Sequence, residues 1–213
     1  MNFKIMSMVT IFILFSACES SKNKKKVIDN IKLEKQEVIS KGIYDIDIEK
    51  SIVKWIGRTP VKSHDGTVDV LKGSLLVDAK GILNAEVTID MNTINCTDLS
   101  GGKKNNLEGH LKNDDFFSVS SFPTAKINLS SNLELNEGMI NFKGNLEIKK
   151  ISHPISFKSK LEKTSAGKYK AVSSFSFDRS MYDIKYKSKS FFDDLGDKFI
   201  NDFIEIDIEI ITL

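Results

Sequence analysis

The feature that most constrains the fold of this chain is an alternation of apolar and polar residues with a period of two. In the last such run, Ile204, Ile206, Ile208 and Ile210 alternate with acidic residues. Because successive side chains of a strand point to opposite faces of a sheet, this pattern predicts strands with one apolar face. The same pattern occurs around residues 45–49, 68–70, 87–89, 127–129, 133–135, 140–142, 146–148, 155–157 and 175–177.

Short polar segments separate these runs. We predict turns at Asp65-Gly66, at Lys80-Gly81 and at residues 136–138 and 165–167. About eight strands with one apolar face leave the fewest unpaired backbone groups at sheet edges when they form a closed barrel or a sandwich. We favour the barrel. The expected fold is all-β, an extended eight-stranded antiparallel barrel whose interior is filled by side chains or holds one small apolar ligand.

Two segments interrupt the alternation. Residues 99–117 open with Gly101-Gly102 and are polar, and residues 185–201 are irregular. We expect the first segment to form one short helix and a loop near a barrel mouth, and the fold to have one or two short helices in its loops.

The N-terminus has the features of an export signal. Residues 5–15 form an apolar stretch of the length found in signal peptides, too short to cross a bilayer. Ser16-Ala17-Cys18 follows and resembles the bacterial lipobox, in which two small residues precede a cysteine that accepts diacylglycerol. The sequence therefore predicts a signal peptide over residues 1–17 and a lipid anchor on Cys18. The alternative is an ordinary cleaved signal with an incidental cysteine.

The segment after Cys18 differs in composition from the rest of the chain. Residues 18–41 are rich in Lys and Glu and have no apolar period, which predicts a solvated, charged tether. The remaining residues, 42–213, are predicted to form the barrel domain.

Composition and motif spacing argue against several classes of function. The net charge is only +2 over 213 residues, so nothing favours nucleic acid as a partner. The three histidines are far apart and lack metal-ligand spacing, and Cys96 is expected to be an unpaired thiol at a strand end. No phosphate-binding loop or nucleophile elbow is present. We therefore expect no metal, no cofactor and no catalytic residues.

Residues 107–117, followed by residues 122–127, resemble the central motif of the YceI-like family. Further matches come in the family's order at Trp55 with residues 64–68, then at residues 87–94, 143–155 and 177–184. The resemblance extends over residues 43–213. It implies a lipocalin-like barrel with a long apolar tunnel, in a periplasmic or secreted bacterial protein that binds polyisoprenoid chains or related lipids.

Aromatic residues are the candidate ligand-binding side chains, because the alternation points them inward or places them near the mouth, and apolar walls suit a hydrocarbon. For any single ring, packing in the core is the better explanation, so the prediction depends on the group as a whole. Arg179 joins this group because an arginine among aromatic residues needs a partner, for which Asp178, Asp114 and a lipid headgroup are the candidates. The aromatic candidates are Trp55, Phe116, Phe117, Phe122, Phe142, Phe157, Phe175 and Phe177.

The leading hypothesis is a lipoprotein of the bacterial envelope that carries or sequesters an apolar chain such as a polyisoprenoid, quinone or fatty acyl group. Acylated Cys18 would attach it to a membrane on the periplasmic side or at the cell surface. The alternative is a filled barrel that acts through its surface as an envelope interaction or stress protein; an enzyme acting on a lipid ranks third. A homodimer remains open.

Overall fold

The structure, a computed structural model, describes residues 39–132 and 139–213. The predicted signal peptide, Cys18 and most of the predicted tether lie outside the described residues, as do the run at 133–135 and the turn at 136–138. Within the described part of the chain, no helix is long and apolar enough to cross a membrane.

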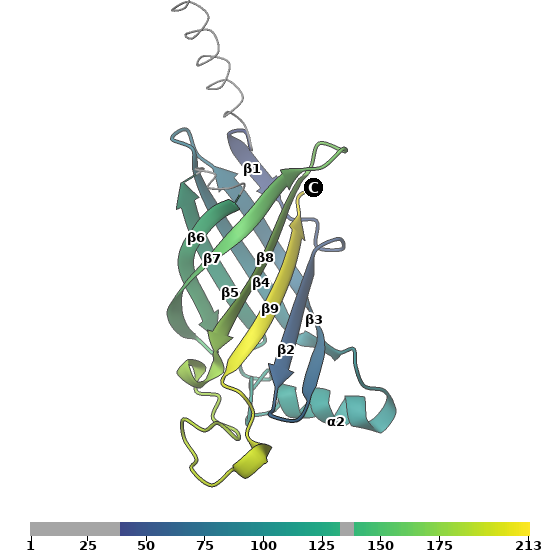
Figure 1. Cartoon of the computed structure of the whole chain (residues 1–213). Coiled ribbons are helices and arrows are strands. Elements are labelled where there is room, and N and C mark those ends of the chain that lie inside the picture. The colour runs from purple at the N-terminus through teal and green to yellow at the C-terminus, as the bar shows by residue number, and fades with distance from the viewer. Residues whose placement is uncertain (1–38, 133–138) are drawn as a thin grey trace, which may run out of the picture. The chain divides into compact units, whose positions relative to one another are not determined.

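The described residues form one antiparallel sheet that closes on itself (Figure 1). The strand order is β1-β3-β2-β9-β8-β7-β6-β5-β4, and pairing of β3 with β4 closes the barrel. The strands are β1 (Gly42–Asp45), β2 (Ile52–Arg58), β3 (Ser63–Val77), β4 (Ile82–Cys96), β5 (Thr124–Asn132), β6 (Met139–Ile148), β7 (Ile151–Lys163), β8 (Tyr169–Asp178) and β9 (Phe203–Ile211).

Strands β1 and β2 share one position in the barrel wall. β1 pairs with residues 74–77 of β3, whereas β2 pairs with residues 63–68 of the same strand. On the other side β2 pairs with β9, and Ile46 just after β1 bridges to Thr212 just after β9. The nine strands therefore fill eight positions, and the predicted eight-stranded antiparallel barrel is confirmed.

The predicted strand over residues 45–49 is wrong beyond Ile46. Asp47 accepts hydrogen bonds from the backbone N–H of Lys50 (3.3 Å) and from its Nζ (2.7 Å), and the chain turns there between β1 and β2. Ile48 is exposed as a result. A side chain that bonds to nearby backbone competes with the sheet ladder, and here it overrides the alternation.

The predicted turn at Asp65-Gly66 is also wrong, because both residues lie inside β3. Gly66 pairs with Trp55, and a Cβ atom on it would overlap the Trp55 indole and the carbonyl oxygen of Asn95. This glycine permits a close approach of neighbouring groups rather than a change of direction. The turns at Lys80-Gly81 and at residues 165–167 are confirmed.

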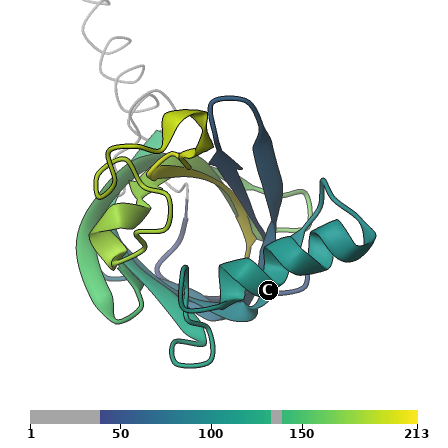
Figure 2. The same ribbon diagram turned by 90° about the horizontal axis from the view of Figure 1, so that it is seen from below.

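The two predicted irregular segments lie at one end of the barrel (Figure 2). The first contains a helix, α2 (Gly101–Lys112), which lies beside the opening and has no buried residue. The second follows a 3-10 helix, η1 (Arg179–Tyr182), and contains another, η2 (Gly196–Lys198). The expectation of short helices in loops near a barrel mouth is thus confirmed.

At the opposite end the interior is packed solid. The side chains there come from the ends of β3, β5 and β7 and from the starts of β4, β6 and β8, and Leu83 and Ile140 are completely buried. Ile39, within the segment predicted as tether, is buried in the same cluster. The residues that close this end are Ile39, Val77, Leu83, Ile140, Leu161 and Tyr169.

Candidate functional site

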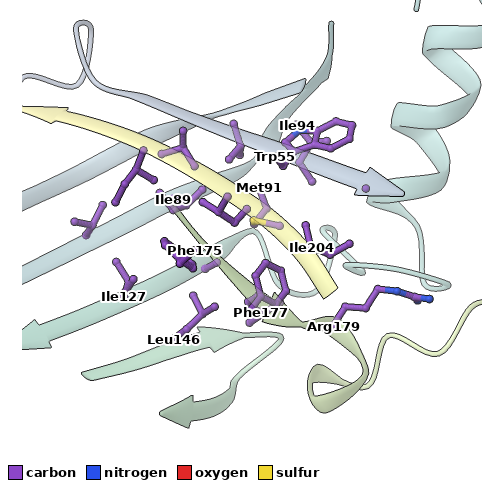
Figure 3. A pocket seen from close by; sticks show the side chains of 18 of the residues that line it. Trp55, Ile89, Met91, Ile94, Ile127, Leu146, Phe175, Phe177, Arg179 and Ile204 are labelled. Atoms are coloured by element: carbon purple, nitrogen blue, oxygen red, sulfur yellow. The ribbon is translucent and has the colours of Figure 1, made fainter. Parts of the chain in front are cut away.

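The interior of the barrel contains a cavity of about 240 Å³ whose wall is almost entirely carbon. This volume lies just below the range typical of small-molecule pockets, roughly 300–1,000 Å³, and suits a slender ligand. Side chains that point inward from strands all around the barrel make the wall (Figure 3). They include Ile89, Met91, Ile127, Leu146, Phe177 and Ile206.

The cavity is blind at one end and open at the other. Its deep end is lined by Leu75, Leu129 and Phe142, which belong to the cluster that packs the closed end of the barrel. Its outer end is lined by Arg58 and Lys62, which are exposed, so the cavity reaches the surface beside α2.

Exposed apolar side chains surround this mouth. Val61 lies in the turn between β2 and β3, Phe191 and Phe192 lie in the loop between η1 and η2, and Phe203 begins β9. Apolar side chains are also exposed at the opposite end, at Ile43, Leu76 and Leu213, so exposure by itself does not single out the mouth.

Seven of the eight predicted aromatic residues line the cavity, and Figure 3 shows three of them, Trp55, Phe175 and Phe177. Phe122 does not line it; its ring lies 5.9 Å from Lys150 Nζ. Phe122 precedes β5 in a loop, where the alternation of a strand does not determine the direction of a side chain. That the seven rings contact a ligand remains a prediction. They are Trp55, Phe116, Phe117, Phe142, Phe157, Phe175 and Phe177.

Two of these rings close the barrel wall where β7 and β8 separate. Pairing between the strands ends at Ser159 and Ser173, and Pro154 farther along β7 has no N–H to donate to a ladder. Just beyond the last pair, the rings of Phe157 and Phe175 stack with their centroids 4.6 Å apart. Side chains thus replace the missing backbone pairing.

Arg179 lines the mouth, and each nitrogen of its guanidinium donates a hydrogen bond to the protein. It begins η1 instead of lying inside a strand, and it donates to the carbonyl oxygens of Asn201 (3.1 Å), Ile184 (3.0 Å) and Ile200 (2.9 Å). Its ion-pair partner is Asp202, with Nη2 and Oδ1 3.2 Å apart, and not Asp178 or Asp114. Burial lowers the pKa of Arg179, and Asp202 opposes that effect. Arg179 therefore fastens the loop after η1 to the barrel.

The histidines lie apart and have structural partners. His64 Nδ1 is 2.7 Å from Asp98 Oδ2, His110 Nε2 is 3.0 Å from Asp115 Oδ2, and His153 bonds to a backbone carbonyl. Among residues 39–132 and 139–213, no group of three or more His, Cys, Asp or Glu side chains is arranged to hold a metal ion.

Cys96 ends β4 as a free, fully buried thiol. Burial, together with the hydrogen bond from its Sγ to Asp98 Oδ1 (3.0 Å), raises the pKa of this thiol. A buried thiol with a raised pKa is a poor nucleophile.

Sequence reasoning missed two polar residues of the cavity, Ser159 and Ser173. Each lies two residues from an inward-facing phenylalanine on its own strand, Phe157 and Phe175. Since a strand repeats every two residues, this spacing was the signal that could have placed both serines inside.

Comparisons with solved structures identify the same fold. The crystal structure of BcnA from Burkholderia cenocepacia aligns with a TM-score of 0.64 at 17% identity, covering 79% of this chain and 100% of that chain. A polyisoprenoid binding domain from Saccharophagus degradans aligns with a TM-score of 0.58 at 14% identity, covering 79% and 97%. The Campylobacter jejuni YCEI protein aligns with a TM-score of 0.50 at 18% identity, covering 68% and 84%.

No curated protein matches the chain significantly in sequence. The YceI-like domain, however, matches residues 44–212, which include every strand from β2 to β9 and the second half of β1. This match covers well over half of the chain and agrees with the motifs, the barrel and the apolar cavity. The chain therefore belongs to the YceI-like family.

Proposed function

We propose that this protein binds one apolar lipid chain, of the polyisoprenoid, quinone or fatty acyl type, in its barrel and carries or sequesters it. The observation that carries the proposal is the apolar cavity inside a barrel whose other end is packed solid. Burying a hydrocarbon there removes it from water, which is worth about 0.8 kcal/mol for each CH₂ group. The similarity in fold to a domain named for polyisoprenoid binding supports this class of ligand.

The direction of entry follows from the shape of the cavity. A chain would enter at the mouth beside α2, where apolar side chains are exposed, and would extend toward the packed end. No catalysis is part of this proposal, and the guanidinium of Arg179 at the mouth is held by Asp202 and three backbone carbonyl groups.

The binding proposal is tested by placing a charge inside the barrel. Phe142→Asp and Phe175→Asp put a carboxylate against the ligand, and desolvating it there is costly, so bound lipid should be lost. Asn141→Asp and Ser176→Asp are matched controls, because both residues are exposed neighbours on the same strands. Lipids extracted from folded, purified protein are identified and quantified by mass spectrometry.

Phe142→Ala and Phe175→Ala, with stability measured alongside, separate loss of binding from loss of folding. If the wild-type protein carries no lipid and takes up none from vesicles, the proposed function is wrong and a role of the surface takes its place.

We further propose that the protein is a lipoprotein of the cell envelope, anchored through acylated Cys18. The apolar segment and the two small residues before Cys18 support this anchor. Cys18→Ser should move the protein from the membrane fraction to the soluble fraction of cells. Retention of the variant in carbonate-washed membranes would rule out the anchor.

A further inference from the structure

Two serines interrupt the apolar wall at the deep end of the cavity. Ser159 of β7 and Ser173 of β8 lie opposite each other in the last pair of the β7–β8 ladder. Both line the cavity, and they are 1% and 4% exposed. They lie next to the stacked rings of Phe157 and Phe175.

The two hydroxyl groups differ in their hydrogen bonds. Ser159 Oγ donates to the carbonyl oxygen of Val172 (3.2 Å). Ser173 Oγ is shielded from solvent and has no hydrogen-bond partner among the residues that the structure describes. A hydroxyl buried without a partner is unfavourable, and in native proteins such a group calls for an explanation. Because this one lies on the wall of a ligand cavity, a polar atom of the ligand can supply the missing partner.

The charges around the cavity limit what that polar atom can be. The nearby Lys158 and Lys160 are exposed on the outer face of β7, and the cationic residues that line the cavity, such as Arg58 and Lys62, lie toward its mouth. A carboxylate or phosphate beside Ser173 would be buried without a counter-charge, which is strongly unfavourable. A neutral carbonyl or hydroxyl oxygen needs only the hydrogen bond that Ser173 can donate.

We infer that the ligand is a neutral lipid that carries a hydroxyl or carbonyl oxygen at the end that enters first, and that this oxygen accepts a hydrogen bond from Ser173 Oγ. The inference rests on the proposed function and sharpens it. Isoprenoid alcohols and quinones have such an oxygen. Hydrocarbons without oxygen lack it, and lipids with a charged headgroup cannot bring that headgroup to the deep end.

The test compares two ligands with the same carbon skeleton, farnesol and farnesene, of which only farnesol has a hydroxyl. Each displaces the neutral fluorescent probe N-phenyl-1-naphthylamine from delipidated protein. Ser173→Ala should weaken farnesol binding by about three- to tenfold, the effect of one neutral hydrogen bond, and leave farnesene binding unchanged. Ser176→Ala, which changes an exposed serine of the same strand, should alter neither.

A second measurement uses the ligand-free protein. Ser173→Ala removes an unpaired buried hydroxyl, so its melting temperature should equal or exceed that of the wild type. A clear decrease would show that the hydroxyl has a structural partner, and would overturn the inference.

The possible results distinguish failure of the oxygen site at Ser173 from failure of the proposed lipid-binding function. If Ser173→Ala changes farnesol and farnesene binding equally, or changes neither, the protein binds apolar chains but the oxygen site is wrong. If neither ligand displaces the probe from the wild-type protein, the proposed function itself fails and the oxygen site fails with it.

Discussion

The two ends of this barrel are built by the same alternating strands but differ in how they are held together. At the closed end Leu83 and Ile140 are completely buried in a cluster of aliphatic and aromatic side chains. At the open end the loops between strands lie beside the cavity. Polar contacts, such as the hydrogen bonds of Arg179, hold these loops in place.

We expect the closed end to contribute most of the stability and the open end to bind the ligand. Close packing gains dispersion contacts and excludes water, so the closed end should dominate the global free energy of unfolding. Side chains at the cavity have empty space on one side and forgo part of those contacts, which leaves room for a ligand.

The largest effect is expected at the closed end. Leu83→Ala should lower the free energy of unfolding by about 3–5 kcal/mol, because it opens a hole in a tightly packed cluster. Chemical denaturation monitored by circular dichroism measures this change.

Ile206→Ala, on the cavity wall, is the matched comparison. Ile206 is only partly buried and already faces empty space, so the loss should be about 1–2 kcal/mol. Equal losses for the two variants would mean that the cavity wall is as tightly packed as the closed end, and the comparison would be wrong.

An intermediate effect is expected for Arg179→Lys at the open end. Lysine keeps the charge, but its single nitrogen cannot take the place of the three guanidinium nitrogens that each contact a different carbonyl group. The loop over residues 184–202 should therefore loosen by about 1–3 kcal/mol. Hydrogen exchange should rise in that loop while exchange at the closed end stays unchanged. Arg58→Lys, at an exposed ion pair, is the control. Faster exchange throughout the barrel would show that the two ends are not independent.

The smallest effect concerns the rim of the mouth. Arg58 contacts Glu205 with Nε and Oε1 2.6 Å apart, and this hydrogen-bonded pair lowers the pKa of Glu205. A lowered carboxyl pKa contributes stability above the ordinary pKa of glutamate, and that contribution is lost as the pH falls through the folded-state value. Both side chains are about half exposed, so solvent screens the pair and the effect should be slight.

Thermal unfolding of Glu205→Gln and wild type at about pH 7 and about pH 3 tests the sign. The small difference at neutral pH should shrink in acid, as Glu205 becomes protonated. A difference that grows in acid would contradict the assignment.

Much of the fold could be predicted because alternation is a local property. The inward direction of side chains such as Ile206 and Phe175 follows directly from the sequence. So do the turn at Lys80-Gly81 and the helix in the segment at 99–117. The predictions were wrong where a contact with a residue distant in the sequence determined the structure. Gly66 suggested a turn, yet the Trp55 side chain on a neighbouring strand is the reason for a glycine there.

The candidate site could be predicted only in part, for the same reason. Strand alternation, or a position in the insertion near the mouth, correctly predicted seven aromatic residues on the cavity wall. The partner of Arg179, however, proved to be Asp202, which the loop after η1 brings back to it. No periodicity in the sequence indicates which residue of a loop returns to a given side chain.

The sequence by itself determined which residues face inward, because a strand sets the direction of each side chain by its place in a repeat of two. Only the tertiary structure decided whether the interior they face is filled. That depends on how the volumes of side chains from all strands add up at each level of the barrel. At Leu83 they leave no room; beside Ser173 they leave a cavity and a hydroxyl without a partner.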